Sequence, residues 1–234
     1  MGLMELSIDT STRYASVALS KDGEVTMQLA WRSEQNHSVE FMPAARRLME
    51  QAGVEVRQIR AVFVARGPGG FSALRVGVSI AKSLAMAQAI PLVAVGTLDI
   101  EAQPYLGLGV PVCVVLPAGR TTVYTGMYGA GDVVGKSADG RHSVGTIDDV
   151  ISSVTEKMLF CGEAAGDIAA SLQETMGGMV RVVVHPPPTR YPSVLAQLGY
   201  RRLQASDTDD PDTLQPIYMR GAQFEAVQRR MPPR

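Results

Sequence analysis

Four residues near the N-terminus, Asp9, Thr10, Ser11 and Thr12, place one acid and three hydroxyls directly after an apolar segment. A turn of this kind can offer backbone N–H groups and hydroxyls to a phosphate, with the carboxylate placed to hold a metal ion or a water molecule. The alternative is a solvated β-turn, because Asp, Ser and Thr commonly bond their local backbone. Spacing alone favours the turn.

A second candidate is the glycine-rich run of residues 66–75, which joins an apolar strand to a helical pattern. The N–H groups that open a helix can hold an anion, and Arg66 or Arg75 would assist. No Lys follows the glycines at the spacing of a phosphate-binding P-loop, and the dinucleotide fingerprint is also unmet. A tight strand-to-helix turn, with Ser72 as N-cap and Phe71 folded onto the helix, is the favoured interpretation.

Metal and nucleophile chemistry find no support in the residue pattern. His37, His142 and His185 are the only histidines, and none is spaced to form a ligand pair with another His or Cys. No G-x-S-x-G elbow occurs, and Ser, His and Asp are scattered without a spacing that would indicate a triad. We therefore expect no metal site, no cofactor and no hydrolase activity, and a structural role for His37 at a helix start.

The elements that must position these residues follow from hydrophobic periodicity. Period-two segments, a hairpin turn and later apolar runs predict strands, while helical spacing and stop signals predict the helices between them. In the first hundred residues the predicted order is β-β-β-α-β-α-β-α, which implies a mixed sheet with packed helices. Strands are expected at 4–9, 15–19, 24–31, 59–65 and 90–95, and helices at 38–51, 72–88 and 97–103. The second half is less regular, with a polar loop expected at 129–145 and a lobe boundary near residues 104–111.

The predicted helix 72–88 carries a ridge of small residues. Gly77, Ala81 and Ala85 recur every four positions, and Lys82 is the only charged residue between Val76 and Gln88. Small aligned side chains let another helix approach closely, and so little polar surface indicates packing on two sides. One side would lie on the protein's own sheet, and the other could face a partner chain.

Composition limits the class of protein. The 234 residues are 46% hydrophobic, and 22 Lys and Arg against 23 Asp and Glu give a formal net charge of -1. Such a balance does not favour tight RNA binding by this chain alone. Cys113 and Cys161 lie in apolar runs typical of buried reduced thiols, and no secretory signal, lipid anchor or membrane span is indicated, so we expect a cytoplasmic protein.

Several of these segments together resemble one family. The runs ELSIDTSTRYASVAL, NHSVEFMP, ARGPGGFSALRVGVSIAKSL and IPLVAVGTL occur in the order found in the TsaB (YeaZ) family, and the tail segment PIYMR is similar to its C-terminal signature. The match is dense over the first hundred residues and sparse beyond them. TsaB proteins belong to the glycoprotease (peptidase M22-like) superfamily and act in the synthesis of threonylcarbamoyladenosine (t6A) in tRNA.

The resemblance implies an α/β fold of the actin-like, sugar-kinase-like (ASKHA) kind, with two lobes that each contain a mixed sheet and packed helices. Residues 1–104 would form the lobe with the partner-binding helices, and residues 105–234 a less regular lobe whose C-terminal tail helix packs back. The implied role is a non-catalytic scaffold or activator that binds the catalytic paralogue TsaD in threonylcarbamoylation of tRNA adenosine 37. A TsaE-like ATPase is a further implied partner, a homodimer is implied for the isolated protein, and tRNA contact is implied only within the complex.

Within the family the two helices matching residues 38–51 and 72–88 build the contact with TsaD. The implied interface residues are His37, Phe41, Ala45, Val76, Gly77, Ala81, Lys82 and Ala85. The family's acidic Asp-Ala-Arg-Arg-Gly-Glu-Val-Tyr stretch is replaced here by residues 117–124, which lack its acids and one Arg. The resemblance also implies that the turn at residues 9–12 corresponds to a vestigial phosphate loop. The alternative function is an ATP-binding, sugar-kinase-like enzyme that uses residues 9–12 as a phosphate loop.

Overall fold

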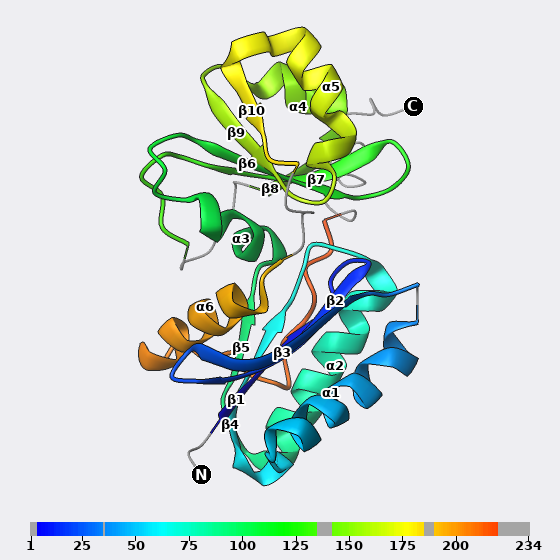
Figure 1. Cartoon of the computed structure of the whole chain (residues 1–234), viewed down its shortest axis with the longest axis vertical. Helices are drawn as coiled ribbons and strands as arrows, with labels where there is room; N and C mark the ends of the chain where they lie inside the picture. The colour runs from blue at the N-terminus through cyan, green and yellow to red at the C-terminus, as the bar shows by residue number, and fades with distance from the viewer. Residues whose placement is uncertain (1–3, 35, 135–141, 185–189, 220–234) are drawn as a thin grey trace, which may run out of the picture.

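The computed structural model describes residues 4–34, 36–134, 142–184 and 190–219, and it contains two five-stranded sheets in two lobes (Figure 1). The first sheet has the strand order β3-β2-β1-β4-β5, with β1, β2 and β3 antiparallel and β4 and β5 parallel to β1. The elements of the first lobe are β1 (Met4–Asp9), β2 (Tyr14–Lys21), β3 (Glu24–Arg32), α1 (His37–Ala52), η1 (Val56–Gln58), β4 (Ile59–Ala65), α2 (Phe71–Gln88) and β5 (Leu92–Val95).

The second lobe repeats this topology. Its sheet has the order β10-β9-β6-β7-β8, in which β6, β7 and β8 are antiparallel and β9 and β10 continue parallel to β6. No internal repeat is visible in the sequence, so the duplication is apparent only in the structure. The elements are α3 (Thr97–Ala102), η2 (Gln103–Tyr105), β6 (Val112–Pro117), β7 (Thr122–Tyr128), β8 (His142–Thr146), α4 (Ile147–Ser153), β9 (Met158–Cys161), α5 (Ala165–Met176), η3 (Gly177–Met179) and β10 (Val180–Val182).

Helices cover both faces of the first sheet, with α1 and α2 side by side on one face and α6 (Pro192–Gln204) on the other (Figure 1). The apolar stripe of α1, Phe41, Ala45 and Leu48, is buried against the sheet as its helical spacing requires. α6 approaches the sheet closely at Gly199, where an added Cβ would lie 2.3 Å from the Phe63 ring. Glycine is the only residue that permits this approach.

α6 and the chain that follows it belong physically to the first lobe, although they come from residues 105–234. After α6, a C-terminal strap (residues 205–219) runs back beside β5 and α2. Asp209 bridges to Leu92, Leu214 enters the first core, and the Ile217 N–H donates to the Arg66 carbonyl at 2.8 Å. The strap contains no helix in its described residues, so this part of the chain does not form the expected tail helix, and residues 220–234 lie outside the described part.

Candidate functional site

The candidate phosphate loop, residues 9–12, is buried and bonded to its own chain. One Asp9 oxygen, Oδ1, accepts from the Ser11 N–H at 2.8 Å and the Ser11 hydroxyl at 2.6 Å. The Thr10 hydroxyl donates to the Ala73 carbonyl at 2.7 Å and accepts from the Gly77 N–H at 3.1 Å. Both contacts tie the loop to the start of α2, so this is an interior turn and the expected solvated one is not found.

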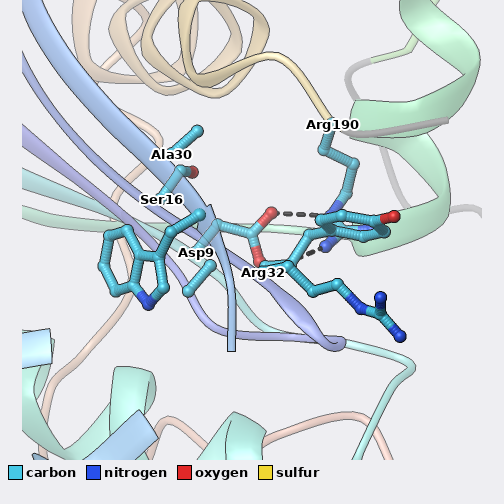
Figure 2. A pocket seen from close by; sticks show the side chains of 8 residues that line it. Asp9, Ser16, Ala30, Arg32 and Arg190 are labelled. Carbon is cyan, nitrogen blue, oxygen red and sulfur yellow. Dashed lines mark hydrogen bonds and ion pairs between the residues drawn. The ribbon is translucent and has the colours of Figure 1, made fainter. Parts of the chain in front are cut away.

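Arg190, just before α6, fills the space in front of the loop. Its Nε donates to Asp9 Oδ2 at 2.6 Å, and its Nη2 donates to the Thr12 hydroxyl at 2.7 Å and to the Tyr14 carbonyl at 3.2 Å. Its Nη1 donates to Glu163 Oε1 at 2.9 Å. Figure 2 shows the guanidinium directed at the Asp9 carboxylate. Loop residues and second-lobe residues are therefore joined through one side chain.

Two glutamates complete this cluster. Glu163 follows β9 in the second lobe, and the Thr12 hydroxyl donates to it. Glu101 lies on α3, with its Oε2 at 3.7 Å from Arg190 Nη1. Burial raises the pKa of Glu101 to about 7, Arg190 opposes this rise, and the charges of Glu163 and Asp9 add to it. Burial lowers the pKa of Arg190, but the three carboxylates outweigh it, so that pKa lies above its ordinary value.

The arrangement leaves the loop little capacity for chemistry. Both Asp9 oxygens and all three hydroxyls already have partners within the chain. A cavity of about 290 Å³ adjoins the cluster on the β2–β3 side and is lined by Tyr14, Ser16 and Arg32 besides Asp9 and Arg190 (Figure 2). The sequence analysis did not identify Arg190, Glu101 and Glu163 as part of this site. None of them lies near residues 9–12 along the chain, so no recognisable motif connects them to the loop.

The glycine-rich run forms the tight turn that was favoured for it. The Gly70 N–H donates to the Ser11 carbonyl at 2.8 Å, and a Cβ on Gly69 would lie 2.0 Å from the same oxygen. One expected detail is wrong, because Gly70, not Ser72, is the N-cap of α2. Phe71 is half-exposed and lies against the helix, with the Arg75 guanidinium 3.7 Å from its ring centre and Tyr218 beside it.

The small-residue ridge of α2 needs a correction, because it faces the chain's own interior. Ala81 and Ala85 lie in the core of the first lobe. Gly77 lets α2 approach the loop, since an added Cβ would lie 2.5 Å from the Thr10 hydroxyl. On α1, Phe41 and Ala45 are buried in the same core. These five residues are buried, and the expectation that they contact a partner is wrong for them.

The other expected interface residues differ from one another. His37 is buried at the start of α1, and burial lowers the pKa of its imidazole while Glu40 and the Thr12 carbonyl oppose the shift. Lys82 holds the C-terminal strap, with its Nζ donating to the carbonyls of Asp212 at 3.4 Å and Leu214 at 3.0 Å. Val76 is partly exposed and still available to a partner.

A different set of apolar side chains is open to solvent on α1 and α2. Val39 is 68% exposed and Met42 is 55% exposed, while Val76 and Ile80 are partly exposed. Because Lys82 and Arg75 face the strap, the opposite flank of α2, with Val76 and Ile80, faces α1. We call Val39, Met42, Val76 and Ile80 the α1–α2 face.

Two features absent from the described residues concern the class of protein. Among them no group of three or more His, Cys, Asp or Glu side chains has the geometry to hold a metal ion. None of the helices that the structure describes has the length and apolar character needed to span a membrane.

Comparison with known proteins adds family and fold. Residues 31–220 match the family model described as TsaD: tRNA N6-adenosine threonylcarbamoyltransferase. The tRNA threonylcarbamoyladenosine biosynthesis protein TsaB of Bacillus subtilis (strain 168) is 28% identical over 225 residues, which cover 94% of this chain and 96% of that protein.

Solved structures agree on the architecture. YeaZ from Pseudomonas aeruginosa superposes with a TM-score of 0.72 at 23% identity and covers 92% of this chain and 99% of its own. A putative N-acetylmannosamine kinase from Listeria monocytogenes has a TM-score of 0.50 at 9% identity, with 87% and 100% covered. The expected two-lobed, sugar-kinase-like α/β fold is thereby confirmed.

Proposed function

The chain belongs to the TsaD threonylcarbamoyltransferase family and, within it, to the TsaB (YeaZ) proteins, and from this membership we propose that it is a non-catalytic subunit for tRNA threonylcarbamoylation. Its role is to bind and support a TsaD-like catalytic paralogue that modifies adenosine 37. A TsaE-like ATPase is a further partner in this proposal, and tRNA is contacted only within the complex. In the absence of TsaD the protein pairs with itself.

The observation that carries the non-catalytic part is the occupied phosphate loop. Arg190 and Glu163 bind the side chains of Asp9 and Thr12, and α2 binds Thr10. A nucleotide phosphate would have to displace a buried guanidinium that has several charge-assisted hydrogen bonds. The ATP-dependent enzyme considered as the alternative has no observation in its favour at this loop.

The α1–α2 face supports the docking part of the proposal. Isolated apolar side chains are common on protein surfaces, but here the exposed Val39 and Met42 of α1 and the partly exposed Val76 and Ile80 of α2 lie on two helices that contact each other. Adjacent helix ridges of this kind are suited to pack against helices of a second chain. The interface we propose therefore uses the outer surface of the two helices that the family resemblance indicated.

A binding measurement with the TsaD-like subunit of the same organism tests the docking face. Met42→Glu places a charge on the face, and we expect the Kd to rise at least about tenfold, a loss of about 1.4 kcal/mol or more of binding free energy. Leu108→Glu is the matched control, because Leu108 is 61% exposed and lies outside the face. Unchanged affinity for Met42→Glu, in a variant that melts like the wild type, would place the interface elsewhere.

Titration calorimetry with Mg-ATP tests the non-catalytic part separately. We expect no measurable binding by the purified chain and no hydrolysis. Firm binding that is abolished in Asp9→Ala would favour the kinase-like alternative and overturn the proposal.

A further inference from the structure

The junction of the two lobes is held by a buried cluster whose members come from four segments. Asp9 ends β1 in the first lobe, Glu101 lies on α3, Glu163 follows β9 in the second lobe, and Arg190 precedes α6. The exposed fractions of these four side chains are between 1% and 4%. Arg190 is within ion-pair distance of all three acids, so the cluster connects the lobes through charge.

The cluster contains more acid than base. Three carboxyl groups surround one buried guanidinium, and the next cation, Arg13, is half-exposed with its Nε 3.7 Å from Glu163 Oε2. Glu101 Oε2 and Glu163 Oε2 are buried, and neither has a hydrogen-bond partner among the described residues. A buried carboxylate without its full set of partners is strongly unfavourable.

The contrast with Glu5 shows that this chain can satisfy a buried glutamate. Glu5 is fully buried as well, but its Oε1 accepts from Arg60 Nη2 at 2.6 Å and its Oε2 accepts from the Ser20 hydroxyl at 2.7 Å. Among the described residues, Glu101 Oε2 has no hydrogen-bond partner, and Arg190 Nη1 approaches it no closer than 3.7 Å. Among the described residues, the buried carboxylate oxygens without a hydrogen-bond partner are those of Glu101 and Glu163, and both lie at the junction.

We propose that Glu101 carries a proton at the lobe junction and that this proton controls how firmly Arg190 clamps the two lobes together. With the proton bound, Arg190 faces the charges of Asp9 and Glu163 only, and both lobes are held by short ion pairs. When the proton leaves for a base in solution, Glu101 becomes a third buried anion, and repulsion from Asp9 and Glu163 loosens the junction.

The surroundings of Glu101 agree with a bound proton. The ionisable groups that face it are Asp9 from β1, Glu163 from the turn after β9, Arg190 from the segment before α6, Cys161 from β9 and Tyr105 from η2. Only Arg190 favours the carboxylate form. Burial, the first cause of the raised pKa, acts in the same direction as the two acids.

Two measurements on the full chain test the proposal without any partner, so a failure here leaves the proposed function untouched. The first is infrared difference spectroscopy, which detects the carbonyl stretch of a protonated carboxyl group. We expect such a band at pH 6 in the wild type, its loss by pH 8.5, and its absence in Glu101→Gln. Glu156→Gln, which changes an exposed acid, is the control and should keep the band.

The second measurement follows the lobes by energy transfer between dyes on Gln28→Cys and Arg181→Cys. Both positions are exposed, one in each lobe, and the native Cys113 and Cys161 are buried. We expect a single interlobe distance at pH 6, a broader distribution at pH 8.5, and no pH dependence in Glu101→Gln. The proposal is overturned by a wild type that lacks the carboxyl band, by interlobe distances that do not respond to pH, or by a Glu101→Gln variant that responds like the wild type.

Discussion

Replacing Glu101 by Gln should change how the stability of the protein depends on pH. The pKa of Glu101 rises from 4.5 to about 7 on folding, chiefly through burial. Because the folded-state pKa is raised, protonated Glu101 contributes to the free energy of unfolding. This contribution is complete below pH 4.5 and is lost as the pH rises through 7. The total loss is about 3 kcal/mol, since each unit of pKa difference corresponds to about 1.4 kcal/mol. Between pH 5.5 and pH 8 the wild type should therefore lose about 2 kcal/mol through this group.

Urea unfolding of the wild type and of Glu101→Gln at several pH values measures this loss. The amide cannot ionise, so the difference in free energy of unfolding should move in favour of the variant by about 2 kcal/mol across that range. Titration of all other groups cancels in the difference. Trp31, the only tryptophan, follows the first lobe by fluorescence, and circular dichroism follows both lobes.

Glu156→Gln provides the control, because its exposed carboxylate should give a difference that is flat with pH. A flat difference for Glu101→Gln as well would mean that folding does not raise the pKa of Glu101. A difference that moves in favour of the wild type as the pH rises through about 4.5, and is flat above it, would mean that Arg190 holds Glu101 as a carboxylate. Either result would refute the charge analysis of the junction.

Three further substitutions test other parts of the structure by urea unfolding. Arg190→Leu should lower the free energy of unfolding by about 3–5 kcal/mol at neutral pH, because it leaves Asp9 and Glu163 buried without their cation. Gly69→Ala should cost about 1–3 kcal/mol, since its Cβ would lie 2.0 Å from the Ser11 carbonyl oxygen, whereas Gly131→Ala, with no atom within 4 Å, should be nearly neutral. Leu214→Ala should cost about 2–5 kcal/mol by removing the strap's anchor from the core. Loss of less than about 1 kcal/mol in any of the three would contradict the packing described for it.

Local patterns predicted most of the elements. The strand expected at residues 59–65 and the helices expected at 38–51 and 72–88 agree with β4, α1 and α2 to within one residue. These elements have strong periodicity and clear stop signals, which depend only on neighbours in the sequence. β8 was missed inside the loop expected at 129–145, because His142–Thr146 is a polar edge strand with no apolar alternation.

The candidate site was less predictable for a physical reason. Asp9 and the three hydroxyls were recognised by type, but their role depends on Arg190, which is 181 positions away from Asp9. The ridge on α2 shows the same limit. Gly77, Ala81 and Ala85 indicate that something packs closely on that side of the helix, and the pattern is identical whether the neighbour is the chain's own sheet or a second protein.

The duplicated topology explains why a residue of the second lobe, Glu163, helps to occupy the loop of residues 9–12. Gly67 follows β4 and Gly162 follows β9, which are equivalent strands, and their φ angles are 109° and 104°. In the first lobe the turn after Gly67 packs on the Ser11 carbonyl, and in the second lobe the turn at Gly162 packs on the Val115 carbonyl. In the second lobe, however, the glycine is followed directly by Glu163. An acid at this point extends from one lobe toward the loop of the other, and Arg190 neutralises it there. The turn thus serves local packing in both lobes, and in the second lobe it also places an acid at the junction.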